Sequence, residues 1–172
     1  LDASTGLYNV RGLARRAREI GAEAARRHAP LACVAVALET GDGTASSGDE
    51  VDPRVADQLG DLCRRTARSS DAVGRLGRSD FAIIAPTTDE AGVLTLAERL
   101  RERVARSDLA SDAGVARVVL SAGYCAVTDF ATSSVDAVEM LLRASTALRH
   151  VRAGDASGTI GAYQDVPGPA VR

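Results

Sequence analysis

Hydrophobic residues recur along this chain with two different periods, and each change of period marks a new element. Between Leu7 and Arg27 apolar side chains return every three or four residues, which predicts an amphipathic helix. Residues 31–38, LACVAVAL, form an unbroken apolar run, which is typical of a central strand buried on both faces. The pair Asp52-Pro53 then offers an N-cap and a first-turn proline, so we expect a second helix that ends near Arg68.

Residues 72–86 have the pattern of strand, tight turn and strand. The short run Ala72–Leu76 precedes the turn Gly77-Arg78-Ser79-Asp80, and the apolar run Phe81–Ala85 follows it. Glycine and small polar residues suit hairpin turns that need φ > 0, so we expect left-handed backbone at this turn.

The second half of the chain continues with helix, strand, helix and strand. Thr88 can cap a helix over residues 89–106, and residues 107–114 are expected to be a loop. Residues 116–127 alternate as a strand does, and a third helix is expected to begin at Ser133 or Ser134. Its inward-facing residues are expected to be Val135, Val138, Leu141, Leu142, Leu148 and Val151. A last short strand is expected at residues 160–163.

From residue 31 to residue 127 the order of elements is strand, helix, strand, strand, helix, strand. This βαββαβ order predicts an α+β fold of the ferredoxin-like or palm type, with one helix added before it and a helix plus a strand after it. We expect an antiparallel or mixed sheet with its helices mainly on one face. At 172 residues the chain fits one domain, residues 1–164, followed by a tail, residues 165–172.

Composition narrows the class of protein. A hydrophobic content of 45% and a net charge of −2 fit a globular domain and argue against a nucleic-acid binder. All 21 basic residues are arginine, which favours planar contacts with phosphates or carboxylates, although most are expected to be a solvated surface. Cys33, Cys63 and Cys125 are too widely spaced for a metal site, and we expect reduced thiols in a cytoplasmic protein.

Two histidines, His28 and His150, are expected at the surface, and no apolar run predicts membrane contact. The chain begins at Leu1, so we expect it to be part of a longer protein with other domains.

Four segments in register resemble the GGDEF domains of the diguanylate cyclase family. Asp2–Asn9, DASTGLYN, resembles the opening D-x-L-T-G-L-x-N, and residues 68–81, RSSDAVGRLGRSDF, resemble R-x-x-D-x-v-a-R-y-G-G-D-E-F. Ser121-Ala122-Gly123 lies where the family has S-x-G, residues 144–148, ASTAL, lie where it has A-D-x-A-L, and Arg152 falls near the lysine of the family's A-K pair.

The resemblance implies a bacterial signalling protein. Active members condense two GTP molecules into cyclic di-GMP between two domains that face each other, with two Mg²⁺ or Mn²⁺ ions at the triphosphates. A homodimer is therefore a possible arrangement for this chain as well.

The signature itself departs from the family pattern. It reads Gly77-Arg78-Ser79-Asp80-Phe81, so a serine replaces the acidic metal ligand and a bulky arginine replaces a glycine that lets backbone approach the nucleotide. We expect Asp80 not to replace the lost acid, because neighbours on a strand point to opposite faces. The other metal-binding aspartate falls on Val36 or Ala37, and only Glu39 approximates its neighbour. We therefore expect no catalytic residues, no metal ligands and loss of Mg²⁺ binding.

A loop replaces part of the family's guanine-reading segment. Its Gly48-Asp49-Glu50-Val51 resembles the family's G-D-x-V but lies about one helical turn too far from Arg68.

The R-x-x-D pair is retained as Arg68 and Asp71. In the family this pair forms an inhibitory site for cyclic di-GMP, to which a helical arginine, here Arg99 or Arg101, can contribute. Arginine can contact guanine O6 and N7 or a phosphate, and aspartate can accept from guanine N1 and N2. The alternative for this pair is a surface ion pair at a helix end.

Three functions stay open. The resemblance favours a catalytically inactive regulatory module that binds cyclic di-GMP through Arg68, Asp71 and Arg99. A dimerisation or regulatory module without nucleotide is the alternative, with GTP held by the Thr5-Gly6 loop without turnover as an intermediate case. Residual cyclase activity ranks last and would need Asp80 or the loop carboxylates Asp42, Asp49 and Glu50.

Overall fold

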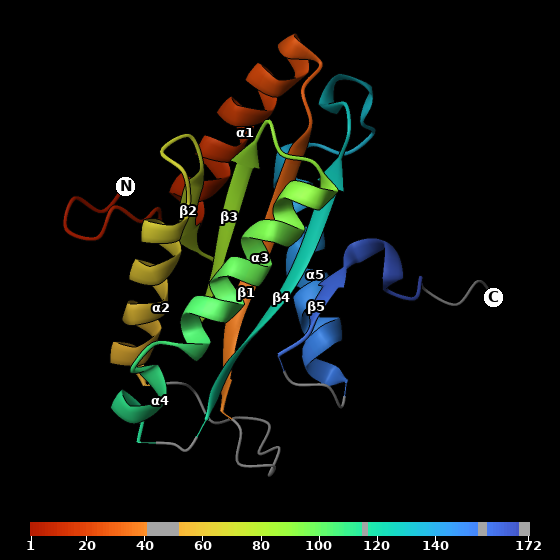
Figure 1. Ribbon diagram of the computed structural model, residues 1–172. Helices are drawn as coiled ribbons and strands as arrows, with labels where there is room; N and C mark the ends of the chain where they lie inside the picture. Colours follow the sequence, from red (N-terminus) through yellow and green to blue (C-terminus); the bar gives the residue numbers. More distant parts are fainter. Residues whose placement is uncertain (41–51, 115–116, 155–157, 169–172) are drawn as a thin grey trace.

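The chain folds around one mixed five-stranded sheet with strand order β2-β3-β1-β4-β5 (Figure 1). The computed structural model describes residues 1–40, 52–114, 117–154 and 158–168. The strands are β1 (Leu31–Thr40), β2 (Ala72–Arg75), β3 (Asp80–Pro86), β4 (Val118–Val127) and β5 (Ile160–Ala162). The central strand β1 pairs antiparallel with β3 and β4, and β5 adds parallel to β4. The expected α+β fold with a ferredoxin-like core is therefore confirmed.

Helices cover both faces of this sheet, so the expectation of helices mainly on one face is wrong. The helices are α1 (Val10–Arg27), α2 (Pro53–Thr66), α3 (Glu90–Ala105), α4 (Leu109–Asp112) and α5 (Ala137–Ala153), with 3-10 turns η1 (Phe130–Thr132) and η2 (Tyr163–Asp165). In Figure 1, α2 and α3 lie in front of the sheet, and α1 and α5 lie behind it. The added N- and C-terminal helices supply this second layer.

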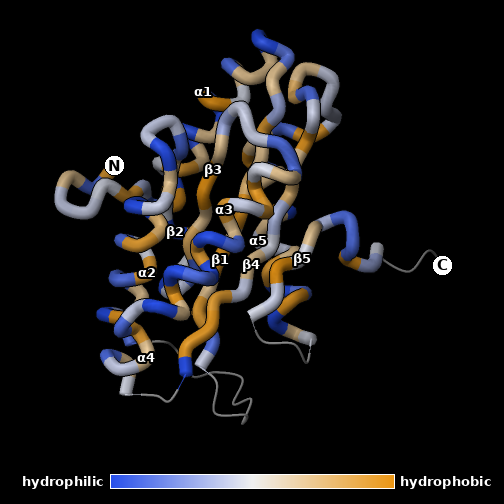
Figure 2. Tube along the Cα trace, viewed as in Figure 1, coloured by the Kyte–Doolittle hydropathy of each residue, from blue (hydrophilic) through white to orange (hydrophobic). Residues whose placement is uncertain are grey.

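The unbroken apolar run of β1 requires this arrangement. Residues 31–38 are all buried, and Figure 2 shows hydrophobic colour along the central strands. Val34 and Val36 pack with α2 and α3, whereas Cys33 and Ala35 pack with α1 and α5. A strand with apolar side chains on both faces needs a hydrophobic layer on each side.

The expected loop over residues 1–9 leads into α1, but Leu7 does not belong to the helical stripe in which its spacing placed it. Asn9 caps the helix by accepting a hydrogen bond from Gly12 N at 2.7 Å, so Leu7 precedes the helix. Leu7 packs on the opposite side of the sheet, with the α2 and α3 cluster. Tyr8 N donates to Val73 O at 2.9 Å, so this segment runs along the outer edge of β2. The opening motif therefore covers the exposed edge of that strand.

Two other helix starts are also corrected. Asp89 rather than Thr88 caps α3, and Asp136 rather than Ser133 or Ser134 caps α5. In both cases the aspartate accepts from the backbone N–H three residues later, as an N-cap should. The buried face of α5 includes Met140 and Ala144, whereas Leu142, expected to face inward, is 62% exposed.

Smaller differences concern the loops. The short helix α4 lies within the expected loop at residues 107–114. The hairpin turn contains no residue with φ > 0; such residues in the described part of the chain are His28, Thr87, Gly6, Gly114 and Gly158. Residues 169–172 and the loop with Gly48–Val51 lie outside the described residues, and the domain boundary at residue 164 stays a prediction. No helix in the described ranges has the length and hydropathy needed to cross a membrane.

Candidate functional site

A pocket of about 370 Å³ lies where α2 ends, β2 begins and the β3–α3 loop returns, and it gathers the three residues predicted to bind a ligand. Arg68 and Asp71 come from the α2–β2 turn, and Arg99 comes from α3. Thr66 and Thr88 also line it, and they are two of the three buried polar residues in the described ranges. Its volume falls within the range of small-molecule pockets.

Asp71 is held in place by the turn that it closes. Its backbone N–H donates to Arg68 O at 3.0 Å, and Arg68 N donates back to Asp71 Oδ2 at 2.8 Å. The side chain is only 2% exposed, and Oδ1 has no hydrogen-bond partner in the described structure. Burial raises the pKa of this carboxyl, and the Arg68 backbone bond and charge lower it by less. Such a buried acceptor suits a ligand that brings its own donors.

The guanidinium of Arg68 lies between Asp71 and the β3–α3 loop. Nη2 donates to Pro86 O at 3.3 Å and to Thr88 Oγ1, whereas Nε stays 3.8 Å from Asp71 Oδ1. The hydroxyl of Thr88 donates in turn to Pro86 O at 2.9 Å. The ion pair named as the alternative for Arg68 and Asp71 is therefore present, but its acid is buried rather than at the surface. The sequence suggested Thr88 only as a helix cap, so its contact with Arg68 was not predicted.

The structure separates the two candidate arginines of α3. Arg99 lines the pocket and forms no hydrogen bond or ion pair with the described residues. Arg101 instead donates to Gly158 O at 3.1 Å and pairs with Glu98, so its charge is used within the fold. Arg99 is thus the helical arginine available to a ligand.

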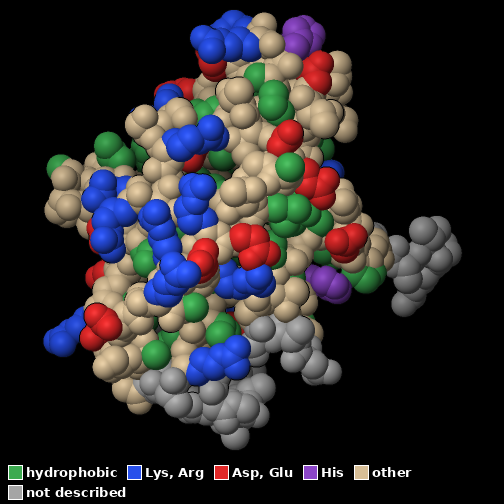
Figure 3. All heavy atoms as spheres, in the orientation of Figure 1, with side chains coloured by type: hydrophobic (Ala, Val, Ile, Leu, Met, Phe, Trp, Pro, Cys, Tyr) green, Lys and Arg blue, Asp and Glu red, His purple; other side chains and the backbone are tan. Residues whose placement is uncertain are grey.

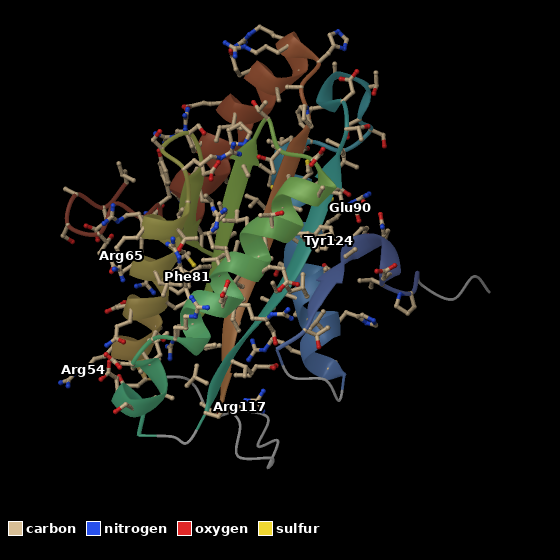
Figure 4. All side chains as sticks on the ribbon, in the orientation of Figure 1. Arg54, Arg65, Phe81, Glu90, Arg117 and Tyr124 are labelled. Carbon is tan, nitrogen blue, oxygen red and sulfur yellow. The ribbon has the colours of Figure 1, made fainter. Side chains whose placement is uncertain are left out.

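Helix α3 carries Arg99, and its first turn is fixed against the sheet through Glu90. Tyr124 donates its hydroxyl to Glu90 Oε1 at 2.8 Å, and the two side chains lie together in Figure 4. Burial and the neighbouring Glu90 raise the pKa of Tyr124 to about 12, so this donor keeps its proton at neutral pH. Figure 3 shows the same face of the molecule, where arginine side chains gather over α2 and α3. This charge favours an anionic ligand.

Together these groups can recognise a ligand with donors on one edge and acceptors beside them. A carboxylate accepts from paired N–H groups, and two guanidinium groups can contact carbonyl, ring nitrogen or phosphate oxygen. A guanine base next to a phosphate presents this combination.

The signature hairpin lies at the other end of β1, roughly 25 Å from the pocket at ~3.3 Å per residue. Phe81 is fully buried there, and its ring leaves no room for a side chain at Gly60. The Arg75 guanidinium stacks over the same ring at 5.1 Å from its centroid. The phenylalanine of the signature therefore serves the core.

Ser79 and Arg78 occupy the turn, as the sequence places them. Val36 packs into the core, and Ala37 lies opposite Asp80. Neither can bind a metal, because their side chains carry no oxygen, nitrogen or sulfur atom. Asp80 and Glu39 do converge, but Arg152 lies beside both carboxylates, with ion pairs at 3.6 Å. Within the described ranges no group of three His, Cys, Asp or Glu side chains could hold a metal ion. These residues do not fit a magnesium centre.

Sequence reasoning missed this convergence, because it depends on the register between β1 and β3. The loop carboxylates Asp42, Asp49 and Glu50 lie outside the described residues.

Comparisons with known proteins agree with this geometry. A family model for "Diguanylate cyclase, GGDEF domain" matches residues 1–156. Among solved structures, the active GGEEF domain of a diguanylate cyclase from Vibrio cholerae is 22% identical with a TM-score of 0.74, covering 93% of this chain and 99% of that one. The GGDEF domain of DgcB from Caulobacter crescentus, in complex with c-di-GMP, is 18% identical with a TM-score of 0.71, covering 95% and 93%. The FimX GGDEF domain from Pseudomonas aeruginosa is 20% identical with a TM-score of 0.69, covering 92% and 96%.

Proposed function

This chain belongs to the GGDEF family of diguanylate cyclase domains, and we propose that it is a regulatory member that binds cyclic di-GMP without making it. The observation that carries this proposal is the pocket in which Arg68, Asp71 and Arg99 meet around an unpartnered carboxylate oxygen. Solved relatives of the same fold were crystallised with c-di-GMP, which supports the choice of ligand.

Recognition follows from the chemistry of the three side chains. Asp71 accepts from the N1 and N2 donors of one guanine, which satisfies the oxygen that lacks a partner in the free protein. Arg68 leaves Pro86 O and Thr88 Oγ1, or shares them, to contact guanine O6 and N7. Arg99 meets a phosphate at the open side of the pocket.

The absence of synthesis is proposed from the signature end of the sheet. A serine hydroxyl at residue 79 is one neutral acceptor, and residues 36 and 37 carry apolar side chains. Divalent cations need charged oxygen ligands to approach a triphosphate. We propose that the module binds the cyclic dinucleotide in the cytoplasm and does not synthesise it. Its partners would be other domains of a longer protein.

Isothermal titration calorimetry with cyclic di-GMP tests the binding. We expect a saturable binding heat in the unaltered protein. The affinity should fall about tenfold to hundredfold in Arg68→Ala, since a hydrogen bond to a charged group contributes ~1.5–3 kcal/mol. Arg65→Ala is the matched control, because its side chain is similarly exposed, 64% against 60%, but pairs with Asp61 on the outside of α2 (Figure 4). An absence of heat in the unaltered protein would contradict the proposal and favour a module without nucleotide.

Synthesis is tested separately by incubating the protein with GTP and Mg²⁺ or Mn²⁺ and analysing the products by chromatography. We expect GTP to stay unconverted. Formation of cyclic di-GMP would refute the inactive assignment and leave the binding result untouched.

A further inference from the structure

One row of side chains crosses the sheet at the end opposite the pocket. Asp80 on β3 and Ser121 on β4 are both register partners of Ala37 on β1, so the three side chains point to the same face. Glu39 lies two residues beyond Ala37 and points to this face as well. Two carboxylates are therefore diagonal neighbours across β1 and β3.

Arg152, in the last turn of α5, lies over these two carboxylates. Its Nε is 3.6 Å from Glu39 Oε1, and its Nη1 is 3.6 Å from Asp80 Oδ1. Two nitrogens of the guanidinium, Nε and Nη1, thus face different acids. No other basic side chain of the described ranges forms an ion pair with either of them.

Ser121 holds the second oxygen of Glu39 in place. It is fully buried and donates its hydroxyl to Glu39 Oε2 at 2.8 Å, while it accepts from Gly158 N at 3.2 Å. The carboxylate is therefore oriented from both sides, by Arg152 and by Ser121. This network links β1, β3, β4 and the end of α5 to Gly158, two residues before β5.

We propose that Arg152 is the resident cation of this site: it replaces the divalent ion that the family fold would place near the hairpin, and it keeps such ions out. The guanidinium cannot lose its charge under physiological conditions and stays attached to the fold. It shields two carboxylates that would otherwise repel each other. A metal ion at 2.0–2.6 Å from both oxygens would have to displace it. This inference stands apart from cyclic di-GMP binding at the distant pocket.

The proposal predicts that removal of one positive charge creates a metal site. In a Mn²⁺ titration followed by electron paramagnetic resonance, the free-ion signal decreases as manganese binds. We expect Arg152→Met to bind one Mn²⁺ at least about tenfold more tightly than the unaltered protein, in the sub-millimolar to millimolar range of weak carboxylate sites. Methionine keeps much of the apolar stem in place. Arg149→Met is the control, because Arg149 lies one turn earlier on α5 and donates to Thr146 instead.

Two further variants test whether Glu39 binds the gained metal and whether the positive charge at residue 152 excludes it. Arg152→Met combined with Glu39→Gln should lose the gained manganese, because the second carboxylate ligand is gone. Arg152→Lys keeps a cation and should exclude Mn²⁺ as the unaltered protein does, even if the methionine variant folds poorly. Circular dichroism establishes that each protein used is folded.

The proposal is overturned by any of three results. The unaltered protein binds Mn²⁺ as tightly as Arg152→Met, Arg152→Lys binds it as tightly as Arg152→Met, or the gained binding survives Glu39→Gln. Either of the first two would show that the charge of Arg152 does not control the site. The third would place the metal elsewhere.

Discussion

Replacing Asp71 by asparagine should stabilise this protein while it weakens ligand binding. The side chain of Asp71 is almost fully buried, and one of its oxygens has no hydrogen-bond partner. Asparagine has the same shape and keeps an oxygen that can accept from Arg68 N, but it carries no charge to desolvate. Leaving a buried polar group unpaired costs ~1–3 kcal/mol, and a charged group costs more.

Because the amide nitrogen of the variant is also unpaired, we expect a net gain of about 1 kcal/mol in the free energy of unfolding at neutral pH. For a chain of this length, this gain corresponds to a rise of roughly 2–4 °C in the melting temperature.

The pH dependence of this difference follows from the raised pKa of Asp71. The folded protein holds the proton at pH values where the unfolded chain, with its ordinary pKa of 3.8, has lost it. The contribution of Asp71 to stability therefore decreases as the pH rises from 3.8 through the folded-state pKa. Asparagine does not titrate, so the advantage of Asp71→Asn should be smallest near pH ~4 and fully present at neutral pH.

Thermal unfolding and urea titrations across this pH range measure the effect. Asp108→Asn is the matched control, because Asp108 is exposed and makes no side-chain capping bond. A less stable Asp71→Asn protein at neutral pH would refute the reasoning, as would an advantage that is equal at both ends of the range. Under the proposed function the same variant loses cyclic di-GMP binding, so stability and binding move in opposite directions, as they often do at functional sites.

Three other substitutions or treatments test the packing. Thr87→Gly should raise the melting temperature, because Thr87 is exposed with φ 53°, a left-handed conformation that costs a β-branched residue about 1–2 kcal/mol; an unchanged or lower value would contradict this strain. Gly123→Ala should cost more than ~3 kcal/mol in urea unfolding or prevent folding, because its methyl group would overlap backbone atoms of Ala147 and Leu148, and a variant of normal stability would show that α5 can shift. Cys33 and Cys63 of the native protein should react slowly with a disulfide reagent, because both are buried, and burial raises the pKa of Cys63 to about 12 and also raises that of Cys33. Rapid modification of either thiol would mean that the core opens readily.

The sequence allowed the elements to be predicted wherever the local pattern was strong. The apolar run of β1, the Asp52-Pro53 start of α2 and the two strands of the hairpin all lie where they were expected. Helix starts were less predictable, because several residues near each start can cap. Thr88 is a good cap in isolation, but in the fold its hydroxyl bonds to Pro86 O and accepts from Arg68.

The candidate ligand residues were predicted by resemblance, but their environment was not. Nothing local to the R-x-x-D pair shows that Asp71 becomes buried or that Arg68 turns toward the β3–α3 loop. The sequence left Arg99 and Arg101 both open, and the fold separates them, because Arg101 binds Gly158 O and Glu98 whereas Arg99 lines the pocket.

The sequence by itself thus determined the order of strands and helices and the double burial of β1, because both depend on hydrophobic periodicity along a short stretch. The resemblance predicted which acids of the signature are missing, and this stays a prediction. The tertiary structure alone decided that helices cover both faces, that Asp71 is buried beside Arg99, and that Arg152 lies between Glu39 and Asp80. These arrangements depend on strand register and on contacts between residues far apart in the chain, and no local pattern encodes either of them.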